Sequence, residues 1–94
     1  MVQQMGSHMA KTVTYSKPAA KVLRGLPANL VRTIDGKMQQ YASNPASLVN
    51  NVIKMQGRRE YMRLRVGDWR VIFTEDAVVI NVVKIDTRGG VYKD

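Results

Sequence analysis

The sequence YMRLRVGDWRVIFT, which occupies residues 61–74, carries the pattern that decides the fold. Apolar and polar residues alternate on both sides of Gly67-Asp68, as they do in two antiparallel strands joined by a two-residue turn. Such a turn sets Arg65 directly opposite Arg70 on the neighbouring strand. We therefore predict a β-hairpin whose register is fixed by this turn.

The two faces of this hairpin differ sharply, because successive side chains of a strand point to opposite sides. The apolar face, suited to packing under helices, holds Met62, Leu64, Val66, Trp69, Val71 and Phe73. The other face holds Tyr61, Arg63, Arg65, Arg70, Ile72 and Thr74. Like charges opposite each other destabilise a hairpin, so the Arg65 and Arg70 pair favours a functional role over a purely structural one.

The residues before the hairpin predict a strand and two helices. Residues 11–15 alternate as a short strand does, and Ser16 is a good N-cap with Pro18 in the first helical turn. Asn44-Pro45 ends the second helix. The apolar positions recur at helical spacing and are Ala19, Val22, Leu23 and Leu26 in the first helix and Leu30, Ile34, Met38 and Tyr41 in the second.

The residues from 46 onward predict a polar loop over 46–51 followed by a meander of three or four antiparallel strands. Glu75-Asp76 is expected to form a second hairpin turn, and 78–85 the final strand. The order strand, helix, helix and meander predicts an α+β domain with both helices on one face of the sheet. The other face would remain open.

Composition bounds the possible chemistry. The 94 residues suffice for one domain, and no cysteine is present, so disulfides and thiolate catalysis are excluded. His8 is the sole histidine, and it lies in residues 1–9, which read as a remnant of a cloning and protease-cleavage site. We expect residues 10–94 to form the single domain, in a reducing, cytoplasmic compartment. The apolar runs are too short for a membrane span, so no membrane partner is expected.

The charge is strongly basic and unevenly distributed. Fifteen Lys and Arg against seven Asp and Glu give a net charge of +8, as expected of a protein that binds phosphates or an acidic partner. Six of the basic residues fall within 54–70, namely Lys54, Arg58, Arg59, Arg63, Arg65 and Arg70. Arginine dominates this stretch, and its planar fork of donors suits phosphate oxygens.

Residues 61–73, together with Gly57 and the tail 85–92 (IDTRGGVY), resemble the RelE/ParE superfamily of type II toxin–antitoxin toxins. The resemblance covers about residues 10–93 and implies the RelE-like fold. The superfamily contains two activities. The RelE branch cleaves messenger RNA in the ribosomal A site, and the ParE branch inhibits DNA gyrase.

The resemblance also implies site residues. The basic and aromatic residues that surround the scissile phosphate in RelE-type nucleases match Arg63, Arg70, Arg88 and Tyr92 here, with Arg65 beside them. Further RNA contacts are expected from Lys54, Arg58, Arg59 and Tyr61. Tyr61 stands where some ribosome-dependent members carry a lysine. The RelE reading is a metal-free and cofactor-free endoribonuclease that uses the RNA 2′-hydroxyl as its nucleophile.

Other functions remain open at this point. The same basic face could dock an acidic surface of DNA gyrase, as in the ParE branch, or serve a plain RNA-binding module. The expected partners are messenger RNA and the ribosome, or gyrase in the alternative. Under either toxin reading, a cognate antitoxin should cover the arginines with an acidic or amphipathic segment.

Overall fold

The computed structural model describes residues 10–55 and 57–87, and for residues 58 and 59 it describes the backbone alone. The predicted remnant at residues 1–9 lies outside the described residues. The elements are β1 (Thr12–Tyr15), α1 (Lys17–Arg24), α2 (Ala28–Ser43), the 3₁₀ helix η1 (Pro45–Leu48), β2 (Val52–Met55), β3 (Arg58–Val66), β4 (Trp69–Glu75) and β5 (Val79–Thr87). The strands form one sheet in the order β1-β5-β4-β3-β2.

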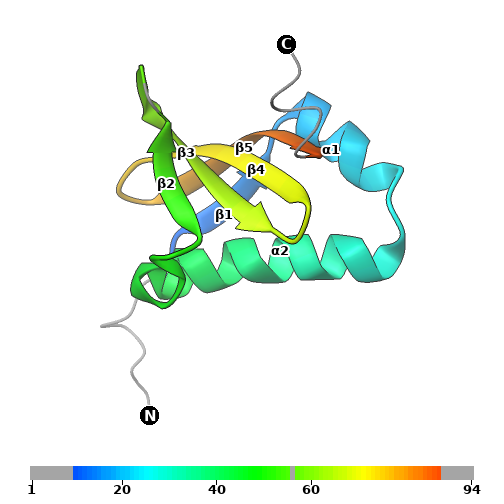
Figure 1. Cartoon of the computed structure of the whole chain (residues 1–94), viewed down its shortest axis with the longest axis horizontal. Coiled ribbons are helices and arrows are strands. Elements are labelled where there is room, and N and C mark those ends of the chain that lie inside the picture. Colours follow the sequence, from blue (N-terminus) through cyan, green and yellow to red (C-terminus); the bar gives the residue numbers. More distant parts are fainter. Residues whose placement is uncertain (1–9, 56, 88–94) are drawn as a thin grey trace.

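Two layers make up the domain (Figure 1). The long helix α2 runs beneath the sheet, and α1 lies at one end of it, beside β5. The predicted α+β class, with helices on one face of the sheet, is confirmed. β2 to β5 form the antiparallel meander, while β1 joins its edge by pairing in parallel with β5.

The core lies between α2 and the sheet. Ile34 and Met38 of α2 are fully buried, as are Leu64 and Phe73 of the β3–β4 hairpin. The ring of Tyr41 packs edge-on against that of Phe73, with 5.1 Å between ring centroids. The apolar face predicted for the hairpin is therefore the face that the helices cover.

The helix ends follow their sequence signals. The Oγ of Ser16 accepts a hydrogen bond from the backbone N–H of Ala19 at 3.2 Å, which satisfies one of the free donors at the start of α1. Asn44 caps the end of α2, as predicted. Tyr15 connects β1 to α2 by donating to the Asp35 carboxylate at 2.6 Å.

Two sequence expectations need correction. The loop expected over residues 46–51 begins in the 3₁₀ helix η1, because the backbone N–H groups of Ser47 and Val49 find acceptors three residues back. The second hairpin turn spans Asp76 to Val78, since Glu75 is still part of β4 and pairs with Ile80 of β5. The final strand accordingly runs over 79–87 rather than 78–85.

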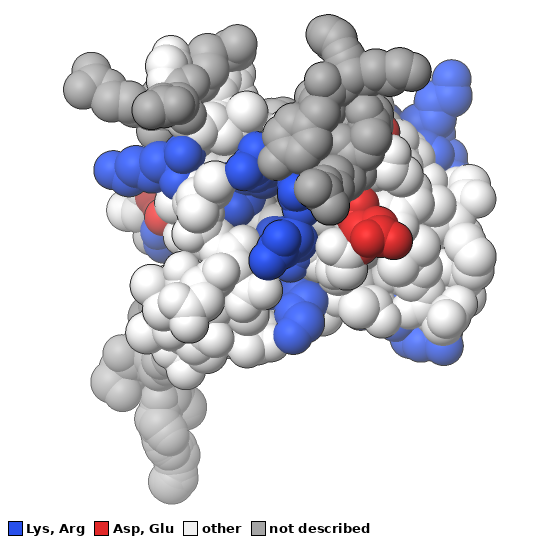
Figure 2. All heavy atoms as spheres, in the orientation of Figure 1, with Lys and Arg blue, Asp and Glu red and all other residues white. Residues whose placement is uncertain are grey.

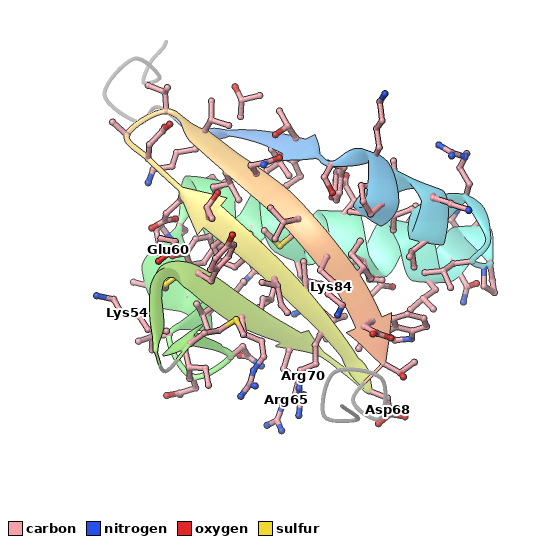
Figure 3. The ribbon with its side chains drawn as sticks, turned by 90° about the horizontal axis from the view of Figure 1, so that it is seen from above. Lys54, Glu60, Arg65, Asp68, Arg70 and Lys84 are labelled. Atoms are coloured by element: carbon pink, nitrogen blue, oxygen red, sulfur yellow. The ribbon has the colours of Figure 1, made fainter. Side chains whose placement is uncertain are left out.

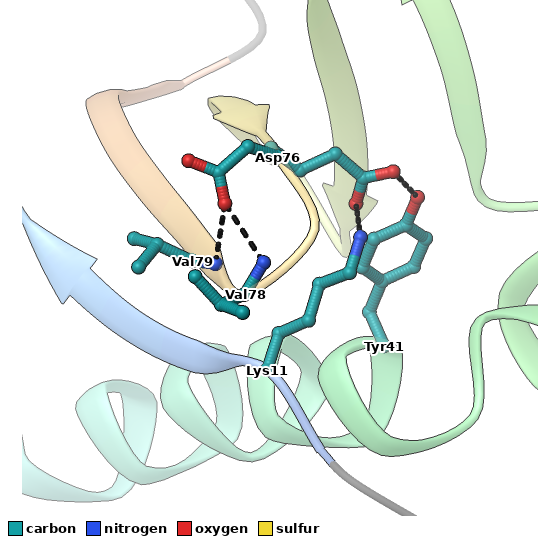
Figure 4. A network of polar contacts seen from close by, with 6 residues as sticks. Lys11, Tyr41, Asp76, Val78 and Val79 are labelled. Atoms are coloured by element: carbon teal, nitrogen blue, oxygen red, sulfur yellow. Dashed lines mark hydrogen bonds and ion pairs between the residues drawn. The ribbon is translucent and has the colours of Figure 1, made fainter.

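A polar network closes this second turn (Figure 4). The Asp76 carboxylate accepts from the backbone N–H groups of Val78 and Val79, both at 2.8 Å, and these bonds lower the pKa of Asp76. The adjacent Glu75 carboxylate accepts from the Tyr41 hydroxyl at 3.2 Å and lies 3.7 Å from Lys11 Nζ. The turn is thus attached to α2 and to the residue that precedes β1.

A substitution at Gly36 should stabilise the domain. Gly36 lies on the exposed side of α2, and a Cβ built there meets nothing within 4 Å. Gly36→Ala should raise the free energy of unfolding by about 1 kcal/mol, because glycine is entropically costly inside a helix. Urea denaturation measures the change. Gly67→Ala is the matched control, because Gly67 has φ +58 and alanine there should cost roughly 1–2 kcal/mol. Equal effects of the two changes would contradict the backbone argument.

Stability should also fall in alkali. Burial, followed by the nearby Glu75 carboxylate, raises the pKa of Tyr41 from 10.0 to about 12. Burial and the bond to Asp35 likewise raise the pKa of Tyr15. A raised pKa adds stability that is present below pH 10 and is lost as pH rises toward 12. Denaturation between pH 8 and 12 should show this loss, and Tyr41→Phe should make it smaller. An unchanged pH profile in Tyr41→Phe would contradict the assignment.

Candidate nucleic-acid interface

The β3–β4 hairpin brings three arginines to the sheet face opposite the helices. Arg65 pairs with Arg70 and Arg63 with Ile72, in the register predicted from the sequence. Arg65 and Arg70 project to the same side of the sheet in Figure 3. The face that the helices leave uncovered is therefore the arginine face.

These side chains surround a hollow that we call the arginine pocket. It has a volume of about 200 Å³ and is lined by Asn50, Asn51, Ile53, Arg63, Arg65 and Arg70. A concave site with several convergent donors of one charge suits a small anionic group such as a phosphate. The predicted convergence of Arg63, Arg65 and Arg70 is confirmed as geometry.

The three arginines differ in how firmly they are held. Arg70 is only 5% exposed, Arg63 is half-buried, and Arg65 is exposed. Asp86 of β5 lies opposite Arg70 in the β4–β5 pairing, so the row across the sheet reads Arg65, Arg70, Asp86. A carboxylate thus lies on one side of Arg70 and a like charge on the other, which partly balances the local charge.

The asparagines of the pocket were missed by the sequence analysis. The backbone C=O of Asn51 accepts from the N–H of Arg65 at 2.9 Å, and its own N–H donates to Leu48 C=O at 2.8 Å. The segment between η1 and β2 is therefore fixed against the edge of β3. The pair Asn50-Asn51 in a polar segment was the available signal, but only the pairing of β2 with β3 shows which site it adjoins.

The remaining predicted site residues lie in different places. Lys54 is exposed on the edge strand β2 and points away from Arg65 and Arg70 (Figure 3), although it shares a neighbouring hollow with Arg63. Tyr61 lies on β3, half-buried. The predicted contacts of Arg58 and Arg59 depend on side chains that are not described. Arg88 and Tyr92 lie outside the described residues.

The charge distribution matches this geometry. Figure 2 shows Lys and Arg side chains gathered in the middle of the face it presents, with acidic side chains beside them. Among residues 10–55 and 57–87, no group of three or more Asp or Glu side chains is placed to hold a metal ion. Within the same residues, no helix has both the length and the apolar character needed to cross a membrane.

Several solved structures share this fold. The RelE chain of the archaeal RelE-RelB complex from Pyrococcus horikoshii is 29% identical, with a TM-score of 0.71, over 86% of this chain and 98% of that one. The RelE toxin of E. coli in the free state is 17% identical, with a TM-score of 0.70, over 87% of each chain. The YoeB dimer from Staphylococcus aureus is 18% identical, with a TM-score of 0.66, over 80% of this chain and 93% of that one.

Sequence comparison identifies the family. No curated protein sequence matches the chain. The family described as "ParE toxin of type II toxin-antitoxin system, parDE" matches residues 13–92, which include the strands, both helices and the arginine face. The resemblance found in the hairpin and tail is thereby confirmed. The chain belongs to the ParE toxin family of type II toxin–antitoxin systems, within the RelE/ParE superfamily.

Proposed function

We propose that this toxin is a ribosome-dependent endoribonuclease that cleaves messenger RNA in the ribosomal A site and so inhibits translation. The observation that carries the proposal is the arginine pocket, in which Arg63, Arg65 and Arg70 converge on one small hollow. Converging guanidinium groups suit the charge that develops on a phosphate during phosphoryl transfer. The likeness of the fold to RelE and YoeB toxins supports the same choice.

The chemistry follows from what arginine can do. The RNA 2′-hydroxyl loses its proton to water and its oxygen attacks the adjacent phosphorus. The P–O5′ bond breaks, the 5′-oxygen takes up a proton and leaves as a hydroxyl, and a 2′,3′-cyclic phosphate forms. Arginine has a pKa above 12 and is a poor general base, so Arg63, Arg65 and Arg70 bind the phosphate and stabilise its added negative charge. The family resemblance implies that Arg88 acts on the leaving oxygen and that Tyr92 stacks on a base or passes a proton.

The ribosome supplies what this site lacks. Alignment of the attacking hydroxyl with the phosphorus contributes a large part of such a reaction, and a site with no histidine has little acid–base power of its own. We therefore expect naked RNA to be cut poorly. Lys54, Arg58 and Arg59 would add contacts to the RNA backbone away from the scissile bond.

A cognate antitoxin is the other expected partner. The similar RelE chains from Pyrococcus horikoshii and Methanococcus jannaschii were each solved in a complex with RelB. For this chain, an antitoxin segment with acidic side chains would neutralise the arginine face and block access to the pocket.

Gyrase inhibition is the second candidate, and the match to the ParE family is the observation that favours it. In that case the basic face and the exposed side of the helical hairpin α1–α2 would dock an acidic surface of the topoisomerase. Such docking needs an extended surface, whereas a small concave pocket is not required.

The two candidates separate in one experiment. Primer extension on a defined messenger RNA, with and without programmed ribosomes, should show new 3′ ends inside A-site codons only when ribosomes are present. Arg65→Ala should reduce the rate roughly 10²- to 10³-fold, as loss of one charge-stabilising donor does elsewhere. Arg32→Ala, on the exposed side of α2, is the control and should cleave normally. Intact RNA together with blocked gyrase supercoiling, measured in parallel, would overturn the nuclease proposal.

Salt dependence tests the arginine face separately from cleavage. Each phosphate contact to single-stranded RNA contributes about 0.7 to the slope of log K against log salt. Arg65→Gln should reduce the slope for a labelled oligouridylate by about that amount, whereas Arg32→Gln should not. Fluorescence anisotropy over a series of KCl concentrations gives the slopes. Arg65→Gln should keep or raise the unfolding temperature, because it removes the repulsion with Arg70. An equal slope change in both variants would mean that RNA is attracted by the overall positive charge of the protein rather than by a defined interface.

A further inference from the structure

β5 contains an irregularity that changes which side chains reach the open face. Ile72 of β4 pairs with Lys84, but the next residue, Phe73, pairs with Val82, so Val83 is an extra residue in β5. A single inserted residue of this kind is a β-bulge. Val82 and Ile85 are buried in the core, whereas Val83 is half-buried and Lys84 exposed. Two successive side chains of β5 therefore reach the open face.

The bulge is held by the start of α1. The backbone N–H of Ser16 donates to Val82 C=O at 2.8 Å, and the Ser16 hydroxyl donates to Val83 C=O at 3.1 Å. Ser16 also caps α1 through its bond from Ala19. The irregular backbone is thus fixed by hydrogen bonds, as expected for a feature that positions side chains.

The displaced residues line a hollow distinct from the arginine pocket. It has a volume of about 370 Å³, and its walls are Met55, Tyr61, Ile72, Val83 and Lys84. Three aliphatic or thioether side chains, one aromatic ring and one ammonium group thus surround it. We call it the Tyr61 hollow.

The Tyr61 hollow and the arginine pocket have a third hollow as their common neighbour. This third hollow, of about 380 Å³, is lined by Ile53, Lys54, Met55 and Arg63. It shares Met55 with the Tyr61 hollow, and Ile53 and Arg63 with the arginine pocket. In the sheet, Ile72 pairs with Arg63 on one side and with Lys84 on the other. An extended ligand could occupy all three hollows along one track.

We propose that the Tyr61 hollow binds one unstacked nucleobase of single-stranded RNA, next to the nucleotide whose phosphate occupies the arginine pocket. The assignment rests on the proposed function and adds to it the subsite that holds the substrate's base. Single-stranded RNA is commonly recognised by stacking a splayed base on an aromatic ring, while basic groups hold the backbone. Ile72 and Val83 supply apolar contact for the base, and Lys84 donates to acceptor atoms on its edge.

The chemistry of the track favours a nucleic acid over an acidic peptide. An acidic peptide would satisfy the arginines, and an amphipathic one could also fill the hollow, so the feature that favours a nucleic acid is the regular spacing of charged and flat groups in a polynucleotide. A polynucleotide alternates phosphates and flat bases, and this track alternates a cationic pocket with an apolar hollow that has an aromatic wall.

A binding cycle that needs no cleavage tests the subsite. The ligand is a fluorescein-labelled deoxyadenosine pentanucleotide, compared with five versions that each carry one abasic residue. It lacks 2′-hydroxyl groups and therefore cannot be cleaved by the proposed chemistry. With the native chain, one abasic position should weaken binding roughly 5- to 100-fold, the range expected for one stacked base. Tyr61→Ala should remove this sensitivity, and Tyr61→Phe should retain it. Lys84→Met should reduce it.

The outcomes separate the subsite from the nuclease. The proposal is overturned if no abasic position matters, if Tyr61→Ala weakens every oligonucleotide equally, or if the native chain binds none of them. Primer extension with the native chain and with Arg65→Ala then reports on the proposed function by itself. Ribosome-dependent cleavage without abasic sensitivity would support the nuclease proposal and contradict the base-binding subsite. Abasic sensitivity without cleavage would support the subsite and contradict the nuclease proposal.

Discussion

The register of the β3–β4 hairpin is the constraint on which the rest of the structure depends. Gly67, with φ +58, allows a turn of two residues, and this turn places Val66 opposite Trp69. Every later pair follows from that one. A shift by a single residue would move the apolar side chains to the open face and bury the arginines, a cost far larger than the whole stability of a small domain. The packing of α2 and the assembly of the arginine pocket are therefore consequences of the same turn.

The sheet provides a firm base for charges that repel each other. Arg65 and Arg70 lie opposite each other on neighbouring strands, which costs stability locally. The cost is offset on the other face, where Leu64, Val71 and Phe73 are fully buried against the helices. Because the backbone is held from below, the strand positions that carry the three arginines are fixed relative to one another. This separation of a stabilising face from a strained one is typical of a binding or catalytic surface.

Local patterns predicted those parts of the fold that depend on local chemistry. The turn at Gly67-Asp68 gave the hairpin register, Ser16 the start of α1, and the stripe through Ile34 and Met38 the buried side of α2. The convergence of Arg63, Arg65 and Arg70 followed from the alternation alone.

What the sequence could not provide depends on contacts between distant residues. The parallel pairing of β1 with β5 joins residues 67 positions apart, such as Thr12 and Val79, and no short-range signal specifies it. The bulge at Val83 is fixed by hydrogen bonds from Ser16, some 67 positions away. Strict period-two alternation along β5 does not allow for this extra residue and therefore assigns Val83 and Lys84 to opposite faces of the sheet. Asn51 joins the pocket through its bond to the backbone of Arg65. In each case the deciding interaction is tertiary.

Two activities within one superfamily pose a question that the fold alone cannot answer, because the same scaffold carries both. The difference must lie in what the open face is built to receive. A protein as large as gyrase would bind to a broad surface of the toxin, and a buried arginine contributes little to binding at such a surface. Here Arg70 is 5% exposed and forms the wall of a hollow of about 200 Å³. A hollow of this size admits a narrow anionic group such as a phosphate, whereas a folded protein surface is too broad to enter it. The convergence of Arg63, Arg65 and Arg70 on this hollow, more than the number of basic residues, is therefore the physical argument for the nuclease that we propose.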